Sequence, residues 1–274
     1  MKAKSPTEAL LVTFLLVLAS VAARGEVQVV PSRPDQGPPA PAVASPQTPT
    51  PPPRSLSLED RADIFMARKN YGEAADYYYR ALKQGNFKNA LTWNKLGIAY
   101  QQQLKYNTAV KAYRNATHLN KDYAEAWNNI GSIYFMENKF GRSVKYYQRA
   151  IELRPKDAAF HLNLGTSYYH LKKYPEAVEE YRVALGIDPN VLTEQSSLGV
   201  IVRARGTDTQ FYFYMAKAFA SIGRAEEAVR YLRRAFEDGF ADQKRVEADP
   251  DFQKISQHPA FIELMKNPPV PIKD

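Results

Sequence analysis

Cysteine is absent from the 274-residue chain. Its absence excludes disulfides, thiolate catalysis, thiol redox chemistry and every metal site built on cysteine. It also excludes a lipid anchor attached to a cysteine behind the N-terminal apolar run. A chain of this size without disulfides must be held together by its hydrophobic core, and 45% of its residues are hydrophobic.

Runs of basic residues are also lacking, although the formal net charge is +8. No stretch holds five consecutive Lys or Arg, and the cations are interspersed with acids, as where Arg230 and Arg233 stand near Glu226 and Glu227. Such mixed charge patterns favour solvated helix surfaces over a nucleic-acid interface. We therefore predict no nucleic-acid partner.

Motifs for catalysis or metal binding are missing as well. The four histidines form no H-E-x-x-H pair or triad-like local pattern, and no glycine-rich loop is suited to phosphate binding. We predict no cofactor, no metal and no enzymatic activity. The least favoured hypothesis is an enzyme or enzyme subunit with its chemistry in residues 192–208. There Arg203, Arg205 and Asp208 lack a nucleophile paired with a base.

Proline is scarce outside one segment, since ten of the 19 prolines fall between Pro31 and Pro53. Residues 24–54 are therefore predicted to be a disordered, proline-rich linker. It could act as a tether that holds the folded part away from a membrane, or it could be a passive spacer. The rest of the chain is free to form helices.

An uncharged apolar run occupies residues 9–23 behind two lysines. This pattern indicates a signal peptide over residues 1–23, with small residues at a cleavage site after Ala22 or Ala23. At ~1.5 Å per residue the run reaches only ~22 Å, short of the ~30 Å hydrocarbon core of a bilayer, which disfavours an uncleaved anchor helix. We expect an exported protein of the periplasm or the extracellular space.

A period of 34 residues dominates the rest of the chain. The recurring positions are Trp93 and Trp127; Gly97, Gly131 and Gly165; Tyr100, Tyr134 and Tyr168; Tyr106, Phe140 and Tyr174; Tyr113, Tyr147 and Tyr181; and Ala116, Ala150 and Ala184. The pattern W-x2-L-G-x2-Y, followed by A-x3-Y-x2-A, resembles the tetratricopeptide repeat (TPR) family of exported bacterial type. The resemblance implies an all-α fold, an α-solenoid of about five helix pairs.

Weaker copies extend the pattern in both directions, so a TPR domain is predicted over residues 55–240. Terminal repeats of a solenoid are expected to be atypical because one of their faces has no neighbour. Two short capping helices, each opened by a proline, and a tail are predicted over residues 241–274. The predicted repeats are 55–88, 90–123, 124–157, 158–191 and 209–240, with an insertion at 192–208.

The repeated glycine needs a packing contact, because glycine inside a helix costs ~1 kcal/mol relative to alanine. We predict that it lets the first helix of a repeat approach a small residue of the second helix. The predicted pairs are Gly97 with Ala109, Gly131 with Ser143, and Gly165 with Ala177. His161, which stands where other repeats have tryptophan, is predicted to be a packing substitution.

The resemblance also implies that the first helices line a concave groove that contacts a peptide. Asparagine offers two donors and an acceptor to an extended backbone, and Phe135 and Tyr169 would add apolar anchors. The alternative for Asn129 and Asn163 is that they only brace adjacent repeats. The predicted groove residues are Asn94, Lys95, Ile98, Gln101, Asn128, Asn129, Ser132, Phe135, Leu162, Asn163, Thr166 and Tyr169.

The predicted function is that of a non-catalytic scaffold that binds a protein or peptide partner in this groove. TPR proteins that bind chaperone tails grip a C-terminal carboxylate with a set of Lys, Arg and Asn. Here only Lys95 is basic among the central groove positions, so recognition of such tails is not predicted. The alternative function is a structural spacer, tethered to a membrane of the cell envelope by an uncleaved N-terminal helix.

Overall fold

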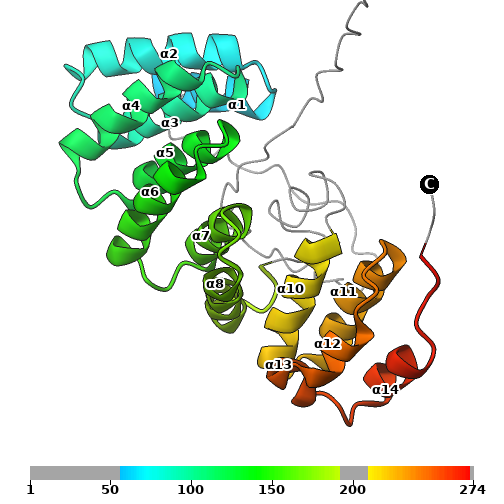
Figure 1. Ribbon diagram of the computed structural model, residues 1–274. Helices are drawn as coiled ribbons and strands as arrows, with labels where there is room; N and C mark the ends of the chain where they lie inside the picture. Colours follow the sequence, from blue (N-terminus) through cyan, green and yellow to red (C-terminus); the bar gives the residue numbers. More distant parts are fainter. Residues whose placement is uncertain (1–55, 192–208, 272–274) are drawn as a thin grey trace, which may run out of the picture.

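The computed structural model describes residues 56–191 and 209–271. The predicted signal peptide, the proline-rich linker and the 192–208 insertion lie outside the described residues. Within those two ranges every regular element is a helix, and the helices stack in consecutive pairs along one arc (Figure 1). The prediction of an all-α solenoid with a helical C-terminal cap is therefore confirmed.

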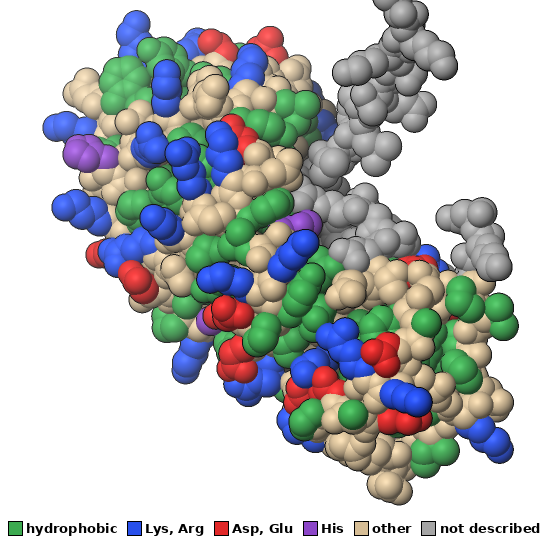
Figure 2. Space-filling model, viewed as in Figure 1, with side chains coloured by type: hydrophobic (Ala, Val, Ile, Leu, Met, Phe, Trp, Pro, Cys, Tyr) green, Lys and Arg blue, Asp and Glu red, His purple; other side chains and the backbone are tan. Residues whose placement is uncertain are grey.

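Five helix pairs form the described stack. In each pair the two helices pack on each other, and the second helix packs on the first helix of the next pair. Lys and Arg side chains gather on the outer side of the first three pairs (Figure 2). The pairs are α1 Leu58–Ala67 with α2 Tyr71–Gln84, α3 Ala90–Gln102 with α4 Tyr106–Leu119, α5 Ala124–Met136 with α6 Phe140–Leu153, α7 Ala158–His170 with α8 Tyr174–Ile187, and α10 Thr209–Ser221 with α11 Ala225–Glu237.

Three short helices close the C-terminal end of the stack: α12 Gln243–Ala248, α13 Pro250–Gln253 and α14 Pro259–Lys266. α13 packs on α10 and α14 packs on α11, and they bury Phe252 and Leu264 in the core shared with these helices. The two helices opened by prolines stand where the sequence predicts them, whereas α12 was not predicted. Its start is marked by Asp242, whose side chain accepts a hydrogen bond from the backbone N–H of Arg245.

The same turn joins the two helices of every pair. Lys69, Leu104, Asn138 and Lys172 occupy the left-handed region of the backbone with φ of 58 to 60°, and Gly223, with φ of 78°, takes this place in the fifth pair. The N–H of the following residue donates to the carbonyl five residues before it, at 2.8 to 3.0 Å. This bond satisfies a carbonyl at the end of the first helix and reverses the chain direction.

Each central glycine faces a tyrosine ring of its own pair. A Cβ placed on Gly131 would lie 2.8 Å from carbons of the Tyr147 ring, which is far inside van der Waals contact. The equivalent distances are 2.5 Å for Gly97 with Tyr113 and 2.7 Å for Gly165 with Tyr181. Glycine is thus required because these buried rings cross the helix where a side chain would stand.

The sequence predicts that the glycines pack against Ala109, Ser143 and Ala177, but the side chains nearest to them are those of the tyrosines. At Gly165 the predicted neighbour Ala177 is also close, with its backbone oxygen 3.1 Å from the Cβ position. A 16-residue spacing puts Ala216 and Leu232 in the places of the glycine and the tyrosine in the fifth pair, and both are fully buried.

Candidate functional site

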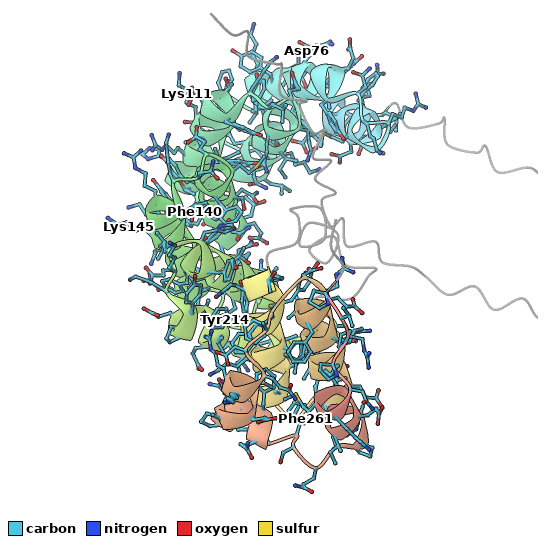
Figure 3. The ribbon with its side chains drawn as sticks, turned by 45° about the vertical axis from the view of Figure 1, so that its right-hand side comes forward. Asp76, Lys111, Phe140, Lys145, Tyr214 and Phe261 are labelled. Carbon is cyan, nitrogen blue, oxygen red and sulfur yellow. The ribbon has the colours of Figure 1, made fainter. Side chains whose placement is uncertain are left out.

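The candidate groove residues come from three successive first helices. α5 contacts both α3 and α7, so the side chains of three repeats meet on one face. This face is on the inner side of the arc, whereas Lys111 of α4 and Lys145 of α6 point outward from it (Figure 3). The solenoid therefore separates an inner surface made by first helices from an outer surface made by second helices.

Asparagine side chains link the three inner helices. Asn129 Nδ2 donates to Asn94 Oδ1 at 3.0 Å, and Asn163 Nδ2 donates to Asn128 Oδ1 at 2.9 Å. Each bond joins positions 35 residues apart, so each asparagine reaches back to the preceding repeat. Bracing of adjacent repeats, the alternative role considered for Asn129 and Asn163, is thus part of the structure.

The hydrogen bonds between repeats do not use every polar side-chain atom of these asparagines. Among the described residues, Asn128 Nδ2, Asn129 Oδ1 and Asn163 Oδ1 make no hydrogen bond, and all three side chains are half-buried. The neighbouring Ser132 and Thr166 hydroxyls donate to carbonyls four residues earlier, at 3.1 and 2.8 Å. The accessible part of this face therefore presents neutral amide donors and acceptors.

Five of the twelve candidates are buried and contribute mainly to packing. Leu162 is 1% exposed and belongs to the hydrophobic cluster that includes α10. The rings of Phe135 and Tyr169 are 8% and 6% exposed and pack edge-on against Phe140 and Phe211. They offer little surface as anchors. The other two buried candidates are Asn94 and Gln101.

Gln101 connects the inner face to the core. It accepts a hydrogen bond from the Tyr113 hydroxyl at 2.7 Å, inside the protein. In the next repeat Tyr147 donates to Ser132 Oγ at 3.2 Å. The tyrosines that cover the glycines thereby fix the rotamers of side chains on the inner face.

Lys95 is neutralised by a residue that the sequence pattern did not single out. Its Nζ lies 2.7 Å from Asp63 Oδ2 of α1, and the Tyr78 hydroxyl donates to the same carboxylate. Burial, reinforced by this hydrogen bond, raises the pKa of Tyr78. Asp63 stands at the position of the first repeat that Ile98 occupies in the second. This acidic residue was the signal in the sequence from which the ion pair with Lys95 could have been predicted. Because of this pairing, the inner face has no free cation at Lys95.

His161 makes the hydrogen bond that tryptophan makes in the two preceding repeats. Trp93 and Trp127 donate Nε1–H to the carbonyl six residues earlier at 3.0 and 2.9 Å, and His161 Nε2 lies 3.0 Å from the equivalent oxygen. Its Nδ1 lies 2.7 Å from Glu180 Oε2. This geometry agrees with a packing substitution. In the described parts of the chain no group of three or more His, Cys, Asp or Glu is placed to hold a metal ion.

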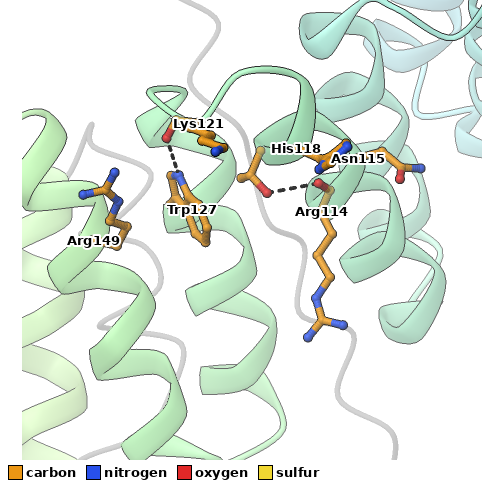
Figure 4. Close-up of a pocket in the computed structure, with 7 residues that line it drawn as sticks. Arg114, Asn115, His118, Lys121, Trp127 and Arg149 are labelled. Atoms are coloured by element: carbon orange, nitrogen blue, oxygen red, sulfur yellow. Dashed lines mark hydrogen bonds between the residues drawn. The ribbon is translucent and has the colours of Figure 1, made fainter.

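A hollow on the outer surface is lined by side chains of α4, α5 and α6 (Figure 4). It is shallow and largely open to solvent, with a volume of about 500 Å³, and none of the side chains that line it is acidic. The Trp127 indole is held in it by the N–H bond to the Lys121 carbonyl. The sequence pattern treated these charges as a solvated surface and did not predict a hollow. Its lining residues are Arg114, Asn115, Thr117, His118, Lys121, Trp127 and Arg149.

Within residues 56–191 and 209–271 no helix has the length and apolarity needed to cross a bilayer. The family model of the tetratricopeptide repeat matches residues 94–153 and, overlapping them, 136–191. No curated protein matches the sequence significantly.

Solved structures of MamA match part of this chain. One crystal structure of MamA is 25% identical over 64% of this chain and 92% of its own, with a TM-score of 0.48. MamA from Desulfovibrio magneticus RS-1, residue 41 to the end, is 14% identical over 66% of this chain and 92% of its own, with a TM-score of 0.49.

Proposed function

Because the chain is a tetratricopeptide-repeat protein, we propose that it is a non-catalytic scaffold that binds an extended polypeptide along its inner face. The observation that carries this proposal is the row of hydrogen-bonding atoms left open on Asn128, Asn129 and Asn163. An extended backbone exposes N–H and C=O groups that such amides can pair with. Because these groups are neutral, the ligand would be held by its main chain rather than by charge.

Rigid presentation is the proposed mechanism. Each asparagine is already held by a bond to the adjacent repeat, and the tyrosine hydroxyls hold Gln101 and Ser132 from the core side. Side chains that are ordered before binding lose less conformational entropy when the ligand arrives. The same bonds therefore brace the solenoid and prepare the binding surface.

Peptide display followed by affinity measurement would test the groove. Peptides are selected on the wild-type chain, and their Kd values are measured by fluorescence anisotropy on an Asn128→Ala/Asn163→Ala variant. Loss of two backbone-directed hydrogen bonds at ~0.5–1.5 kcal/mol each should weaken binding about 5- to 160-fold.

The matched control is Asn107→Ala/Gln257→Ala, which removes two exposed amides outside the inner face. The control should bind with wild-type affinity. If the groove variant and the wild type bind with equal affinity, and circular dichroism shows both to be folded, the proposal that the peptide binds in the groove is contradicted.

We also propose that the protein is exported to the periplasm or the extracellular space. The proposal is supported by the apolar run at residues 9–23 with small residues at its end. Mass spectrometry of the mature N-terminus tests it. A first residue near position 23 or 24 supports export with cleavage, whereas an intact Met1 supports the membrane-tethered spacer.

A further inference from the structure

The outer surfaces of α4 and α6 carry an excess of positive charge. α4 contains two cations and no acid, and α6 contains three cations and the single acid Glu152. The equivalent helix of the fourth repeat, α8, reverses this balance with three glutamates and one arginine. We call the cationic surface the basic outer face; it comprises Lys111, Arg114, Lys121, Arg142, Lys145 and Arg149.

Several of these cations have no partner to neutralise them. Lys111 and Lys145 stand one repeat apart, are exposed, and form no ion pair or side-chain hydrogen bond with any described residue. Both point away from the arc (Figure 3). Their ammonium groups are therefore accessible to a ligand.

Other cations of the basic outer face are held in place by aromatic side chains beneath them. Arg114 of α4 donates from Nη2 to the Tyr134 hydroxyl at 3.2 Å, and the guanidinium carbon of Arg142, from α6, lies 5.7 Å from the centroid of the same ring. Hydrogen bonds to Tyr146 and Tyr134 raise the pKa of Arg114. Charges from two helices are thus oriented around one tyrosine of α5.

The hollow between α4 and α6 gives this face its shape. Trp127 lines it, and the Trp127 and Tyr134 rings both stack on Tyr146, with centroid distances of 6.1 and 5.2 Å. Because these rings cover one another, they provide little open π-surface on which nucleic-acid bases could stack. A flat bilayer would meet the outward-pointing lysines but would not enter the hollow. A narrow acidic chain can reach both.

We propose that the basic outer face binds an acidic segment of a partner protein. Carboxylates of the segment pair with Lys111 and Lys145 on the two helices and with Arg114 at the hollow, where Arg149 is already paired with Glu152 at 2.9 Å. This site lies opposite the groove proposed for neutral backbone recognition, so the scaffold can hold two different segments at once. Attraction between exposed charges makes the interaction sensitive to salt.

The test measures binding of a fluorescein-labelled peptide of alternating Glu and Gly, about 12 residues long, by anisotropy at about 50 mM salt. The variant is Lys111→Glu/Lys145→Glu. Its control, Lys83→Glu/Lys244→Glu, changes the net charge by the same amount at exposed positions elsewhere. We expect at least about tenfold weaker binding for the variant and less than about threefold for the control.

Three outcomes would overturn the proposal. The first is no binding of the peptide to the wild type, and the second is equal loss in variant and control, which would mean attraction by net charge alone. The third is tighter binding of an oligothymidine of equal charge, or of vesicles containing phosphatidylglycerol, than of the peptide.

Two additional variants keep the result interpretable. If the glutamate variant fails to fold by circular dichroism, Lys111→Gln/Lys145→Gln replaces it, and retained wild-type affinity in that variant also overturns the proposal. Asn128→Ala/Asn163→Ala should bind the acidic peptide normally, which separates failure of this site from failure of the groove.

Discussion

The central helix pairs and the fifth pair fill the same crossing in different ways. In the third pair the glycine at 131 leaves room for the buried Tyr147 ring, whereas the fifth pair has Ala216 and Leu232 there. A larger residue on the first helix is thus matched by a smaller one on the second. The tyrosine also ties the core to the inner face through Ser132, which leucine cannot do. The central pairs therefore combine packing with support of a polar surface.

The largest expected effect comes from Gly131→Leu. Its side chain would occupy the position of the Tyr147 ring, so we expect destabilisation of about 3 kcal/mol or more, measured by denaturant unfolding. Gly141→Leu is the control, because a Cβ at Gly141 has nothing within 4 Å. An unchanged free energy of unfolding for Gly131→Leu would contradict the crossing described above.

The next prediction replaces the residues at the crossing of the third pair with those that the fifth pair has there. Tyr147→Leu alone leaves part of the ring volume empty and should cost about 2–3 kcal/mol. In the double variant Gly131→Ala/Tyr147→Leu the added methyl enters that space. We expect it to be more stable than the sum of the single effects by about 1 kcal/mol. Strict additivity in this double-mutant cycle would show that the two positions are not coupled.

Two tyrosines separate packing from hydrogen bonding. The Tyr113 hydroxyl donates to Gln101 at 2.7 Å, whereas the buried Tyr181 hydroxyl makes no hydrogen bond of ordinary geometry with the described residues, although the Thr166 side chain lies near it. Tyr113→Phe should therefore cost about 1–2 kcal/mol, because Gln101 loses a buried donor. Tyr181→Phe should be neutral within about 0.5 kcal/mol. Thermal unfolding of the two variants gives the answer, and equal losses would count against the assigned bond.

The smallest effect is a dependence on alkaline pH. Burial raises the pKa of the Tyr113 and Tyr181 hydroxyls above the ordinary value of 10.0. The unfolded chain therefore releases these protons first, so their stabilisation is complete below pH 10 and is lost as the pH rises above it. At a pH of about 10.5, wild type should have lost up to ~1 kcal/mol more than Tyr113→Phe. Parallel stability curves would contradict this.

The sequence predicted the solenoid well because its signal is periodic. The 34-residue recurrence of glycine and tyrosine locates the helix pairs, and the prolines at 250 and 259 open the last two helices of the cap. α12 was missed because six residues are too few to show a helical period. The tyrosine ring opposite each glycine was not predicted, because spacing shows which residues share a face, but not how far a ring reaches across it.

The candidate groove was harder to predict, since exposure depends on neighbouring repeats. Leu162 occupies the position of Asn94 and Asn128, yet contact with the fifth pair buries it. The asparagine bonds connect positions that differ by 35 rather than 34 residues, so alignment of repeats does not reveal them. The outer hollow depends on side chains from α4, α5 and α6 together, and no single motif encodes it.

The one-after-another packing of the helices has a consequence for biosynthesis. Among the described residues, the main contacts of each helix up to α8 are with its neighbours in the sequence. A nascent chain can thus acquire structure in the order in which it leaves a ribosome or a translocation channel. Only the last step waits for the C-terminus, when Phe252 and Leu264 seal the end of the stack.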